Sequence, residues 1–159
     1  MSLEKLIEDL RNGGGLTRAK AAAALGKLGH KGAIGPLIEA LQDNNVGVRN
    51  NAAFALGELG AKDAVSHLAA LLNDPEEWAR KSAAKALGMI GSRGAVSRLA
   101  LAIEDPSYIV RKNAVRSLGQ IGGMTAEKAI ERAVADSHQV VSKMAADILE
   151  KIRSGKPSA

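Results

Sequence analysis

The sequence predicts an extended all-α protein built from stacked two-helix repeats. One observation is composition: 29 of the 159 residues are alanine and 18 are leucine, whereas Phe54, Trp78 and Tyr108 are the only aromatic residues. Alanine and leucine favour helices, and strands are normally enriched in β-branched and aromatic residues. The other observation is an internal repeat, because arginine recurs at positions 18, 49, 80 and 111 with a constant spacing of 31 residues. A period of this length predicts one two-helix unit per repeat.

The same order of residue types follows each of these arginines, and the alignment needs no insertion or deletion. Leucine stands seven residues after each arginine, a glycine comes next, a second glycine follows, and an aspartate closes the unit. These columns are Leu25, Leu56, Leu87 and Leu118; Gly26, Gly57, Gly88 and Gly119; Gly29, Gly60, Gly91 and Gly122; and Asp43, Asp74, Asp105 and Asp136.

The first helix of each unit is expected to begin after the aspartate and to end at the second glycine. A capping aspartate accepts hydrogen bonds from the first-turn N–H groups, and glycine readily takes the left-handed conformation that ends a helix. We also expect each aspartate to pair with the arginine six residues later, as Asp43 with Arg49. The alternative role for the arginine column is a ladder that binds phosphate groups. After a short turn, a second helix buries its alanine and leucine columns.

The first glycine of each pair lies inside a helix, where glycine costs about 1 kcal/mol relative to alanine. Because four units carry it, a packing reason is expected, and close approach of a neighbouring helix is the simplest one. In the last, incomplete unit, Glu150 and Arg153 replace the two glycines. No further unit needs docking room there, and a polar outer face keeps the end of a stack soluble.

The repeat organises the whole chain, residues 1–159, as a single solenoid. An N-terminal half repeat is expected at 1–12, because Leu6 and Leu10 match a second helix of the preceding phase. Four full repeats, a C-terminal half repeat and a disordered tail follow. The expected boundaries are 18–48, 49–79, 80–110 and 111–141 for the full repeats, 142–153 for the half repeat, and 154–159 for the tail.

The segment Arg18-Ala-Lys-Ala-Ala-Ala-Ala-Leu-Gly-Lys-Leu-Gly and its three counterparts resemble the HEAT-like repeats of the phycobiliprotein-lyase (PBS lyase) family. The resemblance covers almost the whole chain. It implies a right-handed α-solenoid (α-α superhelix), with the first helices outside and the second helices lining a concave face. Lyase activity is not implied, because repeats of this kind are modules of many unrelated proteins. A role as an accessory subunit of a chromophore lyase-type enzyme rests on the resemblance alone.

Several kinds of chemistry are excluded by residues that the sequence lacks. Without cysteine, the chain forms no disulfide, thiol nucleophile, iron–sulfur cluster or cysteine-ligated zinc site. No glutamate follows His30, His67 or His138, and no two of them share a helix face, so no metal site is expected. The related iron-binding hydroxylases built on HEAT repeats use His-Glu pairs. Hydrolase, phosphate-loop and dinucleotide motifs are also missing. We therefore expect a non-enzymatic protein without a cofactor.

Charge and hydropathy restrict the location and the partners only loosely. The net charge is +5, from 22 basic and 17 acidic residues. No apolar run approaches the ~18 residues that span a bilayer, and the N-terminal residues lack the pattern of a secretory signal. We expect no membrane association, and a cytoplasmic protein is the default.

The second helices carry the residues that we expect to bind a protein partner. Apolar residues occupy the expected concave face of the middle units, and an exposed strip of this kind suits a protein partner or self-association. The alternative is that these residues pack within the stack. The candidates are Ile34, Ile38, Val65, Ala69, Val96, Ala100 and Leu101.

Trp78 is a further candidate, because it departs from a column that holds Gly47, Ile109 and Val140 in other units. Tryptophan is enriched among the residues that dominate binding energy in interfaces. A tryptophan near a helix start is therefore either a contact for the partner or a cover for the groove between two units.

A basic field on the first helices of the later units gives an alternative surface. Such fields bind nucleic acid or another acidic partner with strong salt dependence. The sequence indicates no aromatic residues beside this field for base stacking, and an ordinary solvated face is the other interpretation. A separate basic column, Lys31, Lys62 and Arg93, marks the turns between helices. The field consists of Lys81, Lys85, Lys112, Arg116 and Lys143.

Overall fold

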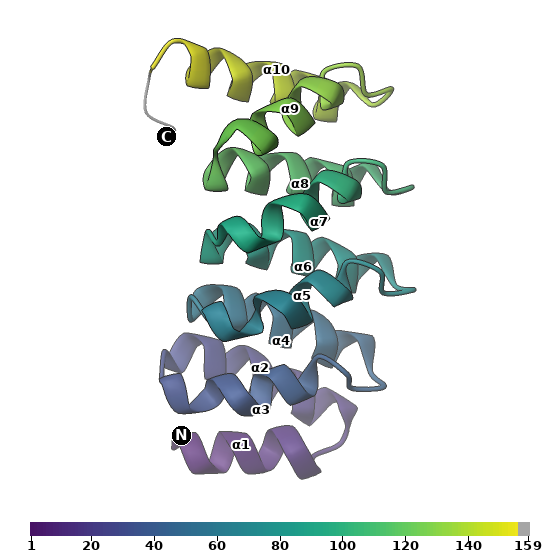
Figure 1. Ribbon diagram of the computed structural model, residues 1–159. Helices are drawn as coiled ribbons and strands as arrows, with labels where there is room; N and C mark the ends of the chain where they lie inside the picture. The colour runs from purple at the N-terminus through teal and green to yellow at the C-terminus, as the bar shows by residue number, and fades with distance from the viewer. Residues whose placement is uncertain (156–159) are drawn as a thin grey trace.

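In the computed structural model, which describes residues 1–155, the chain is an all-α right-handed solenoid, and the predicted fold class is confirmed (Figure 1). The helices stack from the N-terminus at the bottom of the view to the C-terminus at the top. They are α1 (Leu3–Asn12), α2 (Gly15–Leu28), α3 (Ile34–Ala40), α4 (Val46–Glu58), α5 (Val65–Leu71), α6 (Glu77–Ile90), α7 (Val96–Ala102), α8 (Tyr108–Ile121), α9 (Met124–Ala133) and α10 (Gln139–Arg153), with 3₁₀ turns at Lys31–Ala33, Lys62–Ala64 and Arg93–Ala95.

The helices form two layers, and the second lies toward the viewer in Figure 1. We call α2, α4, α6, α8 and α10 the first-helix layer, and α1, α3, α5, α7 and α9 the second-helix layer. The core is a strip between these layers, and each buried leucine contributes about 2 kcal/mol. Its fully buried residues include Leu25, Leu56, Leu87 and Leu118 from the first layer, and Leu37, Leu68, Leu99 and Ile130 from the second.

None of the helices within residues 1–155 combines the length and the apolar character that a bilayer crossing requires. Residues 156–159, which belong to the predicted tail, lie outside the described part of the chain. The division into four full and two half repeats stays a prediction.

Glycine brings the backbones of neighbouring first helices together, as predicted. A Cβ added at Gly26 would stand 2.8 Å from the Cα of Ala55, and one added at Gly57 would stand 3.0 Å from the Cα of Ala86. Each glycine therefore repeats because a side chain there would push the next helix away. The second glycine of the pair ends its helix, since Gly29 has a φ of 71° in the left-handed region.

The first helices begin later than the sequence predicted. Each starts three residues after its aspartate, and Asn45 and Ser107 provide the N-caps of α4 and α8. The carboxylate of Asp43 instead accepts a hydrogen bond from the N–H of Asn45 at 2.8 Å, inside the loop. The prediction that the aspartates cap these helices is therefore wrong, because a turn separates them from the first helical residue. The equivalent aspartates accept from Glu76, Ser107 and His138.

Candidate interaction surface

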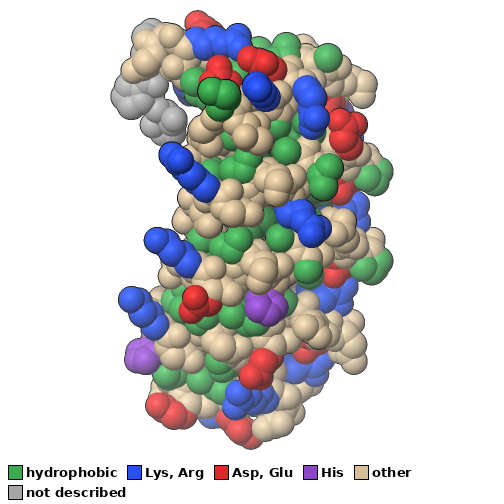
Figure 2. Space-filling view, viewed as in Figure 1, with side chains coloured by type: hydrophobic (Ala, Val, Ile, Leu, Met, Phe, Trp, Pro, Cys, Tyr) green, Lys and Arg blue, Asp and Glu red, His purple; other side chains and the backbone are tan. Residues whose placement is uncertain are grey.

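Grooves separate successive second helices, whereas the first helices α2, α4 and α6 pack closely. Figure 2 shows this face, with apolar side chains in the depressions between successive helices. A groove of about 310 Å³ between α3 and α5 is lined by Ile38 and His67. A groove of about 190 Å³ between α5 and α7 is lined by Arg98 and Leu101. A third, of about 410 Å³, lies beyond the C-terminal ends of α7 and α9 and includes Arg132. The second-helix face is therefore grooved at successive repeats.

The residues of the predicted apolar strip differ in how much of each is accessible. Leu101 is 68% exposed, whereas Ala69 and Val96 are buried. The remaining members of the strip are half-buried and pack against the core. A partner can therefore reach most of the Leu101 side chain but only a small part of the other side chains in the strip. The half-buried members are Ile34, Ile38, Val65 and Ala100.

Polar residues that the sequence prediction left out line the same grooves. His67 and Arg98 occupy equivalent positions, 31 residues apart on α5 and α7, and both are exposed. Asn73 and Glu104 are also equivalent and lie where these grooves reach the loops. The repeat period was the signal that would have found them, because it places these side chains on the same face.

The two ends of the second-helix face are charged and partly paired. Near the C-terminal end, Arg153 contacts both Glu127 and Glu131 of α9. Near the N-terminal end, Arg11 of α1 lies 3.5 Å from Glu39 of α3. The surface thus runs from an ion-paired end, across the apolar middle, to a second ion-paired end.

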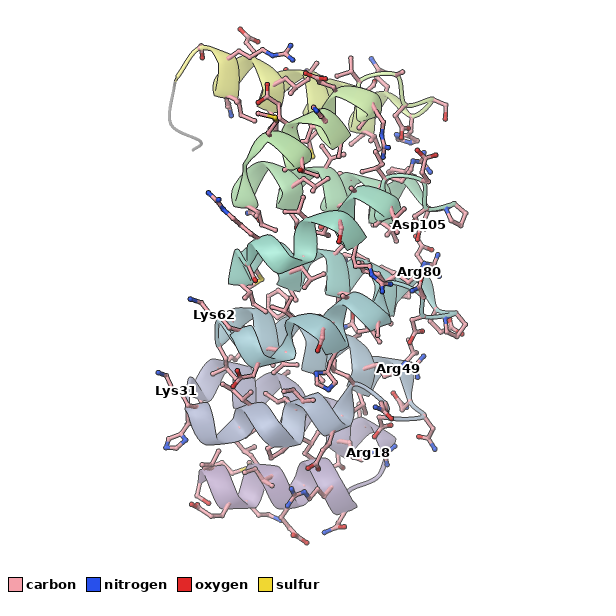
Figure 3. All side chains as sticks on the ribbon, in the orientation of Figure 1. Arg18, Lys31, Arg49, Lys62, Arg80 and Asp105 are labelled. Carbon is pink, nitrogen blue, oxygen red and sulfur yellow. The ribbon has the colours of Figure 1, made fainter. Side chains whose placement is uncertain are left out.

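A ladder of arginines and aspartates fixes the loops along one edge of the molecule (Figure 3). Arg49 donates from Nε and Nη2 to the two carboxylate oxygens of Asp74, at 2.8 and 3.0 Å. Its Nη1 donates to the main-chain oxygen of Asp43 at 2.8 Å. Each arginine therefore bonds the loop before its own helix to the loop of the next repeat. The other pairs are Arg18–Asp43, Arg80–Asp105 and Arg111–Asp136.

The structural role of the arginine column is confirmed, but the predicted partner was wrong. Arg49 pairs with Asp74, 25 residues later, and not with the carboxylate of Asp43. The ladder is largely shielded from solvent, since the Arg49 and Asp74 side chains are 12% and 7% exposed. With its donors occupied in this way, the ladder is poorly placed to bind phosphate groups.

The same bonds shift the acidity of two carboxyl groups in the ladder. The hydrogen bond from Arg18 lowers the pKa of Asp43, and the N–H of Asn45 acts in the same direction against the effect of burial. The hydrogen bond from Arg111 likewise lowers the pKa of Asp136. Both aspartates are therefore held in their charged form by the fold.

The basic field lies on α6, α8 and α10, and aromatic residues accompany part of it. Lys81 Nζ stands 4.7 Å from the ring centroid of Trp78, and Lys85 Nζ stands 4.8 Å from that of Phe54. The interpretation that no aromatic side chain accompanies this field is therefore wrong. Trp78 itself is 57% exposed. The other members of the field are Lys112, Arg116 and Lys143.

The separate basic column lies at the opposite edge from the ladder. Lys31, Lys62 and Arg93 are all exposed, and each begins the 3₁₀ turn before a second helix. Figure 3 shows Lys31 and Lys62 pointing away from the stack. Within residues 1–155, no group of three or more histidine, aspartate or glutamate side chains is arranged to hold a metal ion.

Comparison with solved structures relates the chain to other helical repeat proteins. It is similar to a chain in the complex of CpcE and CpcF of phycocyanin lyase from Nostoc sp. PCC7120, with a TM-score of 0.86 and 26% identity over 97% of this chain and 66% of that one. This chain thus spans about two thirds of the length of that protein.

Two further structures share the fold. A designed armadillo repeat protein in complex with the peptide (KR)4 matches with a TM-score of 0.74 and 23% identity, over 93% of this chain and 80% of that one. Human deoxyhypusine hydroxylase matches with a TM-score of 0.64 and 21% identity, over 92% of this chain and 73% of that one. No curated protein sequence matches the chain.

The family is shown by sequence. The family description for HEAT repeats matches residues 3–88, 36–102 and 96–159, which together span almost the whole chain. The likeness to the phycocyanin lyase complex agrees with the resemblance to the HEAT-like repeats of the PBS lyase group. The chain therefore belongs to the HEAT-repeat proteins.

Proposed function

We propose that the chain is a non-enzymatic protein-interaction module, a scaffold that binds a protein partner on its second-helix face. The two grooves between α3 and α5 and between α5 and α7 are the observation that supports this most strongly. An apolar centre surrounded by polar residues is typical of protein–protein interfaces. Because the ladder holds successive loops in place, a partner meets a preorganised surface, and less ordering free energy is lost on binding.

Leu101 is the residue that we expect to contribute most to this binding. It is 68% exposed on α7 and lies beside Arg98 in the groove between α5 and α7. Leu16, on α2 of the first-helix layer, is 70% exposed and provides a matched control. Substitution of either leucine by glutamate changes the charge equally and leaves the core untouched.

The experiment compares partner capture by the two variants. Wild-type chain, Leu101→Glu and Leu16→Glu are immobilised, and proteins captured from the source organism are quantified by mass spectrometry. We expect a partner that wild type and Leu16→Glu retain equally and that Leu101→Glu loses by at least about tenfold. Thermal melting verifies that both variants are folded. Equal capture by Leu101→Glu would contradict the proposal.

A second candidate function is binding of nucleic acid or another acidic partner through the basic field. The cation–π pairs of Lys81 with Trp78 and of Lys85 with Phe54 favour it, because single-strand binders combine cations with exposed aromatic rings. Labelled duplex and single-stranded oligonucleotides are titrated at about 50 and 200 mM salt. Steep weakening with salt, and loss of binding in the Lys81→Glu, Lys85→Glu double variant, are expected. Absence of binding at low salt eliminates this candidate.

A third candidate is an accessory subunit of a chromophore lyase-type enzyme, which the likeness to the CpcE–CpcF complex supports. Such a subunit would contribute a binding surface, and catalytic groups would come from its partner. The test is whether a chromophore-bearing protein is captured and whether its chromophore content falls when the chain is deleted. Unchanged chromophore content counts against this candidate.

A further inference from the structure

A groove of about 480 Å³ lies between α8 and α10, and its lining comes from these two helices of the first-helix layer. It is separate from the grooves of the second-helix face, so its role is independent of the scaffold function. Arg116 and Lys143 also belong to the basic field, and this role therefore deepens the second candidate function. Gly119 of α8 and Ile148 of α10 both line it and approach each other closely. Between α2 and α4 and between α4 and α6, by contrast, glycine brings the helix backbones into contact.

Ile148 accounts for the opening. The equivalent positions of α4, α6 and α8 hold the small residues Ala55, Ala86 and Ser117. A Cβ added at Gly119 would meet side-chain atoms of Ile148, the nearest being Cγ2 at 2.9 Å, whereas Gly26 and Gly57 each meet a Cα atom of the next helix. The first three glycines of the column are buried and Gly119 is half-buried. The larger side chain therefore holds α10 away from α8.

The polar bonds that join other first helices are also missing from this interface. Asn51 of α4 donates to the main-chain oxygen of Ala19 at 2.8 Å, and Ser117 of α8 donates to that of Ala84 at 2.6 Å. The residue of α10 that is equivalent to Asn51 is Met144, which has no group to donate. In the described residues, no side-chain hydrogen bond joins α10 to α8, so polar contacts do not close the groove.

The groove combines an apolar stripe with a cationic rim. Val140, Met144 and Ile148 follow one another at intervals of four residues along one face of α10, and Val140 is 46% exposed. Lys143 and Lys151 flank this stripe on α10, and Arg116 stands on α8. Within residues 1–155, Asp147 is the one carboxylate among the lining residues. The lining therefore carries a net positive charge beside an uncovered apolar surface.

We propose that this groove binds an amphipathic helix of a partner protein, one whose apolar stripe is flanked by acidic side chains. A groove between two helices accepts a third helix through apolar anchors at intervals of three and four residues. The stretch from Val140 to Lys151 is about 16 Å long, or about three helical turns. The cationic rim selects glutamate and aspartate beside the anchors. Nucleic acid fits less well, because no aromatic ring among the described residues lines the groove for base stacking.

The probe is a fluorescein-labelled helical peptide of ~14 residues, about four turns. Leucine stands at every third or fourth position, and glutamate stands on both sides of this stripe. A control peptide has lysine in place of each glutamate. Fluorescence anisotropy with the full chain measures both affinities. We expect the acidic peptide to bind and the lysine peptide to bind at least about tenfold more weakly.

Two double variants separate the local effect from the overall charge. Arg116→Glu with Lys143→Glu reverses the rim, and Lys31→Glu with Lys62→Glu reverses two exposed cations at the turn edge. Both pairs change the net charge by the same amount. We expect only the Arg116→Glu, Lys143→Glu variant to lose affinity for the acidic peptide, by at least about tenfold. Ile148→Ala is expected to let α10 approach α8 and to weaken peptide binding to a similar extent. Circular dichroism should show that this variant retains its helix content.

Several results would overturn the proposal. One is equal affinity of the acidic peptide for the two double variants, and another is a Met144 methyl signal in nuclear magnetic resonance that does not move when the peptide is added. If sedimentation shows that the wild-type chain is a dimer and that only the Arg116→Glu, Lys143→Glu variant is a monomer, the groove would be assigned to a second copy of this chain. A duplex oligonucleotide that binds more tightly than the acidic peptide would assign it to nucleic acid.

Discussion

The two layers of this solenoid pack in opposite ways. In the first-helix layer, glycine at one helix and a small residue at the next bring backbones into contact from α2 to α6. In the second-helix layer, grooves separate α3, α5 and α7. One layer thus provides contact between repeats, and the other provides accessible surface. A repeat protein can therefore hold its stack together on one side while it leaves the other side open for binding.

One column of residues differs between the closed first-helix interfaces and the open one. Small residues at positions 55, 86 and 117 accompany close packing, whereas Ile148 accompanies the groove between α8 and α10. Closed and open packing therefore also occur side by side within the first-helix layer.

The largest effect is expected at the closed interface. Gly26→Ala places a Cβ against the backbone of Ala55, and we expect a loss of about 2–3 kcal/mol in the free energy of unfolding. Gly119→Ala places its Cβ 2.9 Å from Cγ2 of Ile148, a side-chain atom and not the backbone of α10, so strain offsets part of the gain of about 1 kcal/mol in helix propensity and the net change is expected to stay within ~1 kcal/mol. Urea denaturation measures both variants. A similar loss in the two variants would show that the interfaces do not differ as described.

The ladder is the next contribution to the closed side of the molecule. Arg49→Met removes two bonds to Asp74 and one to the main chain of Asp43, and leaves a shielded carboxylate without its partner. We expect a loss of about 2 kcal/mol in the free energy of unfolding. The exposed pair of Arg11 with Glu39 is the matched control. Arg11→Met is expected to change the free energy of unfolding by less than ~0.5 kcal/mol. Equal losses for Arg49→Met and Arg11→Met would show that the ladder contributes no more to stability than an exposed ion pair does.

A smaller effect is expected from acid, because protonation weakens the ladder bonds without deleting a side chain. The pKa of Asp43 and of Asp136 is lowered in the folded chain, so the folded state binds these protons less readily than the unfolded state does. Their stabilisation is thus complete above the unfolded pKa of about 4 and is lost as the pH falls through the lower, folded pKa. Urea denaturation from neutral to acidic pH should show stability falling below about pH 4. Asp43→Asn should lower stability at neutral pH and flatten that acidic limb; an unchanged limb would contradict the assignment.

The smallest effect on stability is expected on the open face. Leu101→Glu alters a side chain that is 68% exposed, so the free energy of unfolding should change by less than ~0.5 kcal/mol. The same denaturation experiment measures this, and a loss above about 1 kcal/mol would place Leu101 within the packed part of the stack.

The repeat period was sufficient to predict the fold, the core columns and the close approach at glycine, because all three depend on spacing alone. It was not sufficient to choose the aspartate that pairs with an arginine. In a regular repeat, Arg49 has Asp43 six residues before it and Asp74 25 residues after it, and the period satisfies both pairings. The loop conformation decides between them, and the sequence pattern does not specify it.

The repeat pattern also did not predict which side chains on the second-helix face are accessible to solvent. Ala69 is buried and Ala70 is exposed, although they are neighbours of the same type, because one residue turns the helix by about 100°. The aromatic contacts of the basic field were visible but missed. Phe54 and Lys85 are 31 residues apart and hence occupy equivalent positions on adjacent helices, while Trp78 and Lys81 are three residues apart on one helix.

Hydrogen exchange measured by mass spectrometry on the chain with and without its captured partner tests whether the partner binds the second-helix face. Binding on the open layer should slow exchange in α5 and α7 and leave α4 and α6 unchanged, because a partner that covers a helix suppresses its local opening. Slower exchange confined to the first helices, with α5 and α7 unchanged, would contradict the assignment of binding to the second-helix face.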